Sequence, residues 1–113
     1  MDDVRLPTAL WVDAHVRRLN ENGQGYYILH RGAYAAGMVL VKVNLLNGLA
    51  DLWVQTRGLD GELGWMRAVG EGVVAESDAD AYIRRAVDRD PDLWVIEVEN
   101  REGKNPFEGK VVL

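Results

Sequence analysis

The aspartates Asp88, Asp90 and Asp92 have the spacing of the first three ligands of a calcium-binding loop, and Glu99 falls at the twelfth position of such a loop. The sixth position, which requires glycine for a sharp turn, is Leu93. A proline between the aspartates stiffens the segment, and the residues that follow alternate like a β-strand, which would carry the glutamate away. The pattern therefore favours a helix end followed by a strand, and we predict no metal site.

His15 and His30 are the two histidines of the chain, and each could act as a general base if a carboxylate and a nucleophile lay within reach. No spacing in the sequence ties either one to such a partner. A partly buried, hydrogen-bonded histidine is the more common case. Because the chain has no cysteine and no HExxH pattern, the sequence gives no support for thiol catalysis or for a zinc site.

Two pairs of adjacent arginines lie near the C-terminal ends of two predicted helices, namely Arg17, Arg18, Arg84 and Arg85. Together with His30 they could form an anion or phosphate clamp, since guanidinium groups bind such ligands through paired hydrogen bonds. The alternative is that they interact with the helix dipoles, by about 0.3–1 kcal/mol each, on polar outer faces. The second interpretation is favoured, and the clamp stays an alternative hypothesis.

These side chains would be positioned by a stretch of three β-rich runs, at residues 26–31, 38–45 and 50–56. The second run alternates with a period of two, which is typical of a strand. Asn47 and Gly48 follow it, and this dipeptide predicts a hairpin with a type I′ turn. We therefore expect an antiparallel meander with one aliphatic face and one mixed face.

The mixed face of this meander is a candidate partner-binding surface. With a further strand at residues 93–99, the face would carry Lys42, Asn44, Trp53, Gln55, Glu97 and Glu99. A tryptophan among polar residues is typical of anchors in protein interfaces. The alternative is a solvated face with cross-strand Lys–Glu pairs and the tryptophan under a loop. The sequence leaves both interpretations open.

Helical periodicity places one helix before the meander and another after it. Pro7 and Thr8 open the first, and the second is predicted to begin at a Ser77 cap and to end before Pro91. With a fourth strand at residues 65–69, the order is α-β-β-β-β-α-β. We predict an α+β fold, in which two helices pack on one face, the aliphatic one, of a four- to five-stranded antiparallel sheet.

The length of 113 residues suits a single domain, which we place at residues 1–103. Residues 104–113 form a C-terminal tail that we expect to be an edge strand or disordered. No apolar run approaches the ~20 residues of a membrane span and no export signal is seen, so the expected location is the cytoplasm. The formal charge of −5 argues against nucleic-acid binding.

Three segments carry a resemblance to a known family. They are Leu-Pro-x-x-x-Trp-Val-x-Ala-x-x-Arg-Arg at residues 6–18, Ala-Gly-Met-Val-Leu-Val-Lys-Val-Asn at residues 36–44, and Asp-Pro-Asp-Leu-Trp-Val-Ile-Glu-Val-Glu at residues 90–99. In this order they resemble a small alphaproteobacterial family of uncharacterised proteins, domain of unknown function 1491, over roughly residues 6–103. The resemblance implies a bacterial cytoplasmic setting and transfers no activity, ligand or catalytic residue.

We therefore expect a non-catalytic protein-interaction or binding module that uses the mixed sheet face to hold a protein partner or a second copy of the chain. The alternative hypothesis is a small binder of an anionic metabolite, or an enzyme, that uses His30 or His15 with the arginine pairs. We expect no cofactor, no nucleic acid and no membrane partner.

Overall fold

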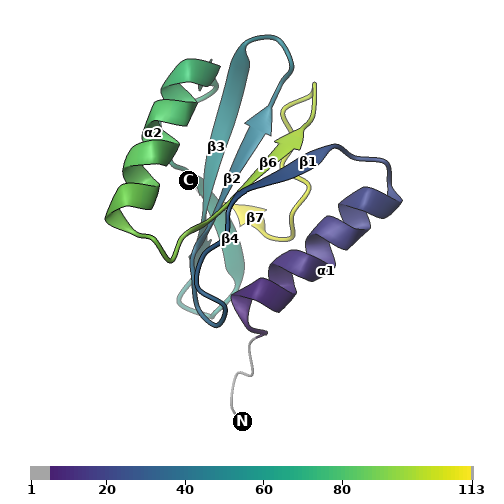
Figure 1. The fold of residues 1–113 in the computed structure, drawn as a ribbon, viewed down its shortest axis with the longest axis vertical. Helices are drawn as coiled ribbons and strands as arrows, with labels where there is room; N and C mark the ends of the chain where they lie inside the picture. The colour runs from purple at the N-terminus through teal and green to yellow at the C-terminus, as the bar shows by residue number, and fades with distance from the viewer. Residues whose placement is uncertain (1–5, 113) are drawn as a thin grey trace.

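The computed structural model describes residues 6–112, which form two helices and one seven-stranded sheet (Figure 1). In chain order the elements are α1 (Thr8–Glu21), β1 (Tyr26–His30), β2 (Val39–Asn44), β3 (Leu49–Arg57), β4 (Leu63–Arg67), β5 (Val74–Ala75), α2 (Glu76–Arg89), β6 (Trp94–Glu99) and β7 (Lys110–Val111). The predicted combination of two helices with a sheet is confirmed. No helix among these residues is long and apolar enough to cross a membrane.

The sheet is mixed rather than antiparallel. Its strands lie in the order β1-β6-β2-β3-β4-β7, with β5 paired to β3. β6 runs parallel to β2 and β7 runs parallel to β4, whereas the other pairs are antiparallel. The prediction of a four- to five-stranded antiparallel sheet is therefore wrong in strand number and direction. The crossover through α2 returns the chain to the sheet beside β2 and in the same direction, as a helical connection allows.

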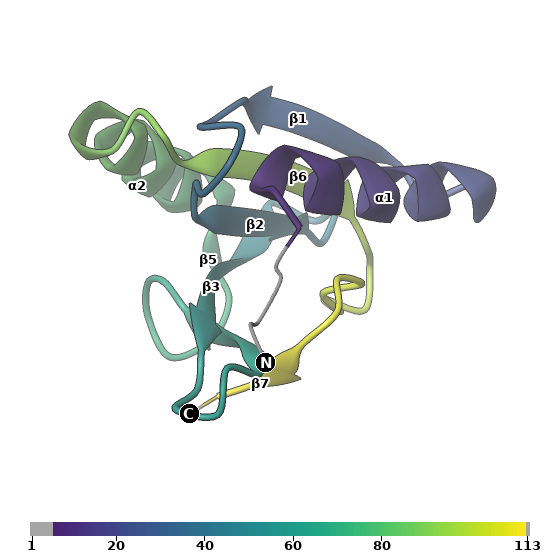
Figure 2. The same cartoon turned by 90° about the horizontal axis from the view of Figure 1, so that it is seen from below.

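α1 and α2 cover opposite faces of the sheet (Figure 1, Figure 2). α1 packs against a cluster that includes Val39, Val41 and Val43. α2 packs against a second cluster that includes Leu40 and Leu52. The prediction that both helices share one face is therefore wrong. The reason is that successive residues of β2 are buried on both sides, as in a central strand with a helix over each face.

The start of α1 is fastened to the connection between β1 and β2. The helix begins after Pro7, and no side chain caps it. Instead, the backbone N–H of Thr8 donates to the Ala35 carbonyl (3.2 Å) and that of Ala9 donates to the Tyr34 carbonyl (2.9 Å). These carbonyls satisfy N–H groups that have no partner within a helix. The connection is thereby held against the first turn of α1.

Two local predictions about a helix end and a turn are wrong. α2 begins after Ala75 without a side-chain cap, so Ser77 is not the cap. In the turn between β2 and β3, positive φ occurs at Leu46 and Gly48 rather than at both Asn47 and Gly48, so the turn is not type I′ at that dipeptide. Asparagine side chains at positions 44 and 47 accept backbone N–H groups here, and these bonds stabilise a longer loop.

Candidate binding groove

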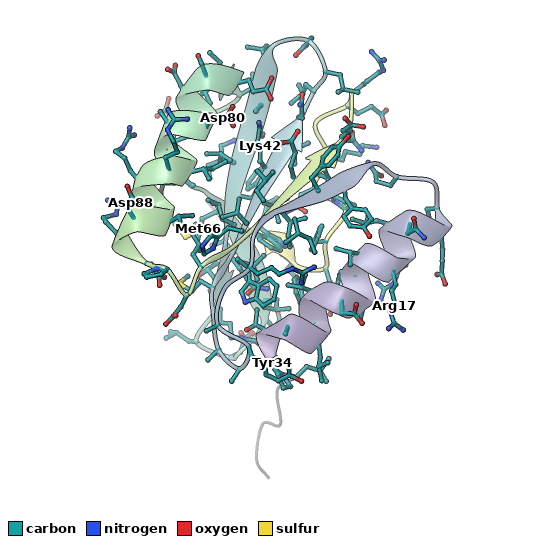
Figure 3. The ribbon with its side chains drawn as sticks, viewed as in Figure 1. Arg17, Tyr34, Lys42, Met66, Asp80 and Asp88 are labelled. Carbon is teal, nitrogen blue, oxygen red and sulfur yellow. The ribbon has the colours of Figure 1, made fainter. Side chains whose placement is uncertain are left out.

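The predicted mixed face is not one open surface, because α2 covers the part around Lys42, which is 2% exposed (Figure 3). The ammonium Nζ lies 2.7 Å from Glu76 Oε2, 2.7 Å from Asp80 Oδ1 and 3.2 Å from Glu97 Oε1. Asn44 joins the cluster by donating to Glu76 (3.2 Å) and to Glu97 (3.0 Å). Three of the predicted residues are thus brought together, and α2 adds two carboxylates.

The Lys42 ammonium stays charged in this cluster. Burial by itself lowers its pKa, but hydrogen bonds to Asp80, Glu76 and Glu97, with the charge of Glu97, outweigh burial and raise the pKa above its ordinary value. A permanently charged amine is neither a general base nor a nucleophile near neutral pH. The cluster therefore fastens the start of α2 to the sheet. The sequence contains a signal for this cluster, because Glu76 and Asp80 are four residues apart and therefore share one face of a helix.

Trp53 and Gln55 point toward the opposite face, which α1 covers. In the pairing of β2 with β3, Lys42 lies opposite Leu52, so these two residues share a face. Trp53 and Gln55 are one and three residues beyond Leu52 and therefore lie on the other face. Trp53 is buried, and the guanidinium carbon of Arg67 lies 4.5 Å from the centre of its ring. The predicted grouping of Trp53 and Gln55 with Lys42 is therefore wrong, because the sequence pattern does not fix the register between two strands.

The α1 face also buries a charge, the carboxylate of Asp51, which is 3% exposed. Arg67 donates to it in a fork, from Nε to Oδ1 (3.2 Å) and from Nη2 to Oδ2 (3.0 Å). The same guanidinium lies over the Trp53 ring. This pair was not predicted, since its two partners lie on different strands and no spacing connects them.

His30 and Glu99 lie near the β1 edge of the sheet. His30 Nδ1 lies 2.7 Å from the Leu93 carbonyl oxygen, and a ring nitrogen meets a carbonyl only as an N–H donor. The Glu99 carbonyl accepts a hydrogen bond from the Gln24 side chain. The first contact joins β1 to the residue before β6, and the second joins the segment before β1 to the end of β6. Glu99 is paired directly with Asn44 and therefore lies on the Lys42 face, whereas Trp53 and Gln55 lie on the other face, so the six predicted face residues do not form one patch.

His15 is buried in an aromatic cluster between α1 and the C-terminal segment. Its ring stacks on Trp11, at 4.0 Å between centroids, and on Phe107, at 5.5 Å. Nδ1 lies 2.8 Å from the Trp11 carbonyl oxygen and donates to it. Nε2 lies 3.7 Å from Glu108 Oε1. The ring therefore packs the α1 face, in accordance with the interpretation of a buried, hydrogen-bonded histidine.

The two arginine pairs do not converge. Arg17 and Arg18 are exposed on α1, and Arg84 and Arg85 are exposed on α2, on the other side of the sheet. Arg17 Nε forms an ion pair with a carboxylate one helical turn away (3.1 Å). A single clamp built from all four guanidinium groups is therefore contradicted by the placement of the two helices.

The three aspartates between α2 and β6 form a turn. Asp90 Oδ1 accepts the backbone N–H of Asp92 (3.1 Å), which is a common way for an aspartate to end a helix. Across residues 6–112, no group of three or more His, Cys, Asp or Glu side chains is placed to hold a metal ion.

A hollow opens where β2 and β3 separate. The last paired residues of these strands are Leu40 and Val54, yet β3 continues to Arg57 beside β4. The space measures about 330 Å³ and adjoins a second hollow of about 100 Å³. We call the two together the β3 groove, and its lining residues are Leu6, Thr8, Trp11, Ala35, Ala36, Gly37, Met38, Gln55, Thr56 and Arg57. Ligand sites commonly measure ~300–1,000 Å³, so the groove suits a small group or a short piece of chain.

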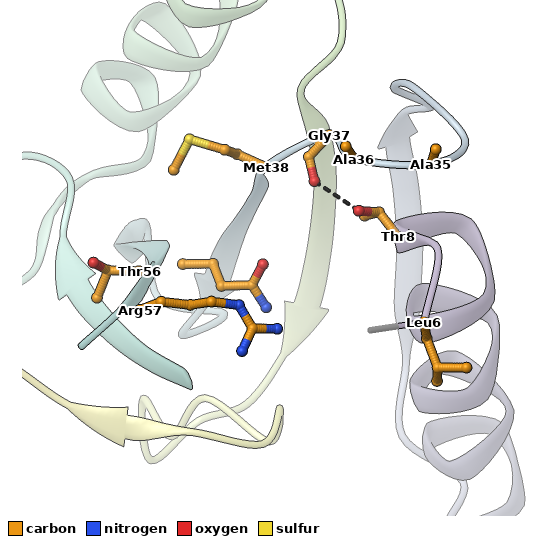
Figure 4. A pocket seen from close by; sticks show the side chains of 9 residues that line it. Leu6, Thr8, Ala35, Ala36, Gly37, Met38, Thr56 and Arg57 are labelled. Carbon is orange, nitrogen blue, oxygen red and sulfur yellow. Dashed lines mark hydrogen bonds between the residues drawn. The ribbon is translucent and has the colours of Figure 1, made fainter. Parts of the chain in front are cut away.

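One wall of the β3 groove is held by hydrogen bonds (Figure 4). Thr8 Oγ1 donates to the Gly37 carbonyl (2.9 Å), and Trp94 Nε1 donates to the Ala33 carbonyl (2.7 Å). A Cβ atom at Gly37 would lie 2.2 Å from the Asp92 carbonyl oxygen, so only glycine fits there. This wall is therefore preformed, and a ligand would not have to order it.

The opposite wall carries Arg57, whose side chain extends into the hollow in Figure 4. Nη1 donates to the Gly61 carbonyl (2.6 Å), and among the described residues this is the one hydrogen bond of the side chain. A guanidinium has five N–H donors, so within residues 6–112 most of the fork has no partner and can bind a ligand. Gln55 adds an amide, while Leu6 and Met38 are exposed apolar residues at the rim.

The β3 groove combines one cation with apolar and amide surface, which suits an anionic group attached to an apolar or peptide-like body. Of its lining residues, only Gln55 was among the predicted site residues. The available signal was the pair of glycines at positions 32 and 37 with three alanines between them, which indicates a close approach of backbones.

A sequence profile of one protein family, described as "Protein of unknown function (DUF1491)", matches residues 6–108. Two solved structures of a DUF1491 family protein from Caulobacter crescentus CB15, one a crystal structure and one an NMR structure, are 38% identical to the chain. Their TM-scores are 0.83 and 0.80, and the matches cover 96% and 98% of this chain and 100% of each of those chains. The solution structure of protein Atu0922 from A. tumefaciens is 26% identical, with a TM-score of 0.69 and 86% of this chain and 87% of that chain covered. No curated protein matches the chain.

Proposed function

Because the chain belongs to the DUF1491 family, whose function is unknown, we propose a function from its own geometry. The chain is a non-catalytic interaction module that binds a short segment of a partner protein in the β3 groove. The observation that carries this proposal is the preformed hollow of about 330 Å³ with Arg57 on one wall. Its size suits a few residues of a partner rather than a whole surface.

The lining of the groove supports a peptide as ligand. Leu6 and Met38 offer apolar contact, and both are exposed to solvent in the described chain. Gln55 can both donate and accept a hydrogen bond, as a peptide group does. Arg57 can bind a carboxylate in a fork. A segment with one acidic and one apolar side chain would use all of these contacts.

The residues best suited to acid–base chemistry are engaged elsewhere, which supports a non-catalytic role. Lys42 is buried and charged among three carboxylates. His30 Nδ1 and His15 Nδ1 each donate to a main-chain carbonyl, and the His15 ring is stacked between two aromatic rings. None of the three lines the β3 groove. Binding without catalysis requires none of them.

A library of short random peptides, displayed on beads and probed with the labelled protein, tests the proposal. Peptides that bind the unaltered protein are then tested against Ala36→Phe, which fills the groove at an exposed position. Ala14→Phe is the matched control, because Ala14 is an exposed alanine of α1 that does not line the groove.

We expect Ala36→Phe to bind the selected peptides at least about tenfold more weakly, and Ala14→Phe to bind them as the unaltered protein does. Circular dichroism and thermal unfolding of both variants check that neither change disturbs the fold. Equal affinity of Ala36→Phe for every selected peptide would mean that the groove is not the binding site.

A further inference from the structure

The β3 groove exposes the edge of a strand that lies inside the sheet. β3 pairs with β2 from Ala50 to Val54 and with β4 from Trp53 to Arg57. Its last three residues therefore have a partner strand on one side only. An unpaired edge presents N–H and C=O groups to any chain that can lie beside it.

The hydrogen bonds of the ladder identify which backbone groups face the groove. The N–H of Gly58 donates to the Glu62 carbonyl, and the N–H of Ala68 donates to the Leu52 carbonyl. In β3, and in Gly58 directly after it, the backbone groups of even-numbered residues therefore point toward β4. Backbone groups alternate along a strand, and odd-numbered residues point the other way. The N–H and C=O of Arg57 consequently point into the space that β2 has left.

From this edge we infer a binding mode that rests on the proposed function: an extended acidic peptide adds as a short strand to β3 at Arg57 and fills the β3 groove. The peptide backbone exchanges hydrogen bonds with the N–H and C=O of Arg57. A glutamate or aspartate side chain of the peptide contacts the Arg57 guanidinium, and an apolar neighbour contacts Met38 or Leu6.

Charge favours an acidic peptide at this place although the chain as a whole is acidic. Arg57 is the one charged residue among the described residues that line the groove. The nearby Lys110 and Glu62 form an ion pair with each other (3.3 Å), so they add no net charge. A carboxylate at the guanidinium gains a charge-assisted, forked hydrogen bond, which a lysine or glutamine at that position of the peptide would lack.

The fold already contains strand additions of this length. β5 pairs with β3 through two residues, and β7 pairs with β4 through two residues. Each adds its few backbone hydrogen bonds to one edge of the sheet. A peptide at Arg57 would make a pair of similar length, with main-chain bonds supplying affinity and the flanking side chains supplying specificity.

The test uses nuclear magnetic resonance with three capped peptides: Thr-Val-Glu-Val-Thr, its analogue with glutamine in place of glutamate, and an analogue in which the glutamate and both valines are N-methylated. N-methylation removes backbone donors and leaves the side chains in place. The readouts are the dissociation constant and the hydrogen exchange of the Arg57 backbone amide. Arg57→Gln, which keeps the backbone and removes the guanidinium, is tested with the same peptides.

We expect the glutamate peptide to bind and to slow exchange of the Arg57 amide by about tenfold or more at saturation. The glutamine analogue should bind about fivefold or more weakly than the glutamate peptide, and this difference should disappear in Arg57→Gln. The N-methylated analogue should leave amide exchange unchanged.

Other results overturn the inference. If the N-methylated analogue binds as well as the glutamate peptide, the groove binds side chains and strand addition is wrong while the proposed function stands. If the Arg57 amide is already protected in the free protein, the edge is not available. If these peptides leave every groove resonance unmoved while peptides from the random library do shift them, only the acidic strand is excluded. If no peptide from either set moves them, the proposed function fails as well.

Discussion

Among the described residues, the two faces of the sheet each bury one charge, and the two charges have opposite sign. On the α2 face the buried group is the cation Lys42, and its partners Glu76 and Asp80 have side chains that are 37% and 42% exposed. On the α1 face the buried group is the anion Asp51, and its partner Arg67 is 31% exposed. In both cases the buried charge has at least one partner of opposite charge whose side chain touches solvent.

The difference lies in what remains when one partner is lost. A carboxylate without its cation on the α1 face stays between β3 and its neighbours, away from water. On the α2 face, Glu76 and Asp80 can turn toward solvent when their cation is lost, and Glu97, whose side chain is 13% exposed, keeps a hydrogen bond from Asn44. Because an unpaired buried charge is costly and an exposed one is not, the two faces should respond unequally to the loss of a cation.

Arg67→Met should cause the largest loss of stability. It removes both donors of the forked pair and leaves Asp51 buried without a counter-charge, so we expect the free energy of unfolding to fall by about 3 kcal/mol. Urea denaturation followed by tryptophan fluorescence measures it. Arg101→Met, at an exposed position, is the control and should change stability by less than about 0.5 kcal/mol. A loss below about 1 kcal/mol for Arg67→Met would show that the Asp51 carboxylate is solvated.

Lys42→Met should cost less, about 1–2 kcal/mol, although Lys42 itself is the more buried cation. Methionine keeps most of the length and apolar contact of the lysine stem, and Glu76 and Asp80 can turn outward. The same denaturation experiment measures the change, with Lys104→Met at an exposed position as its control. If Lys42→Met is more damaging than Arg67→Met, the proposed ranking of the two faces is reversed.

The smallest expected effect is the pH dependence of the Lys42 contribution. The pKa of Lys42 is raised in the folded chain from its ordinary value of 10.5, so its stabilisation is complete below that value and is lost only as pH rises through the folded pKa. The difference in unfolding free energy between the unaltered protein and Lys42→Met should therefore stay constant from pH 7 to about pH 10. A difference that shrinks between pH 7 and pH 9 would mean that burial has lowered the pKa instead.

The sequence predicted the elements better than their arrangement. The alternation at β2 correctly separated Val39, Val41 and Val43 from Leu40 and Lys42, because side chains of a strand alternate whatever covers them. It did not reveal that both sets are buried. A lysine is rarely buried, and the carboxylates that make its burial tolerable come from a helix that begins more than thirty residues later.

The candidate site could not be predicted as a unit, because three separate segments form it. Thr8 comes from the start of α1, Gly37 from a connection, and Arg57 from the end of β3. Each residue has an ordinary local explanation, as a helix start, a turn glycine and a polar strand end. What makes a groove of them is that β2 stops pairing at Leu40 while β3 continues. A difference in the length of two paired strands leaves no periodic pattern in the sequence.

The position of β6 has a consequence for how the chain reaches its fold. This strand is the penultimate one in the sequence, yet it lies between β1 and β2 and holds them in one sheet. Until residues 94–99 have left the ribosome, β1 and β2 have no partner in common, and the edges of both strands that will pair with β6 stay unpaired. Pairings across so much of the sequence are slow to form, so the closing step of folding should be limited by the entropy of a long loop.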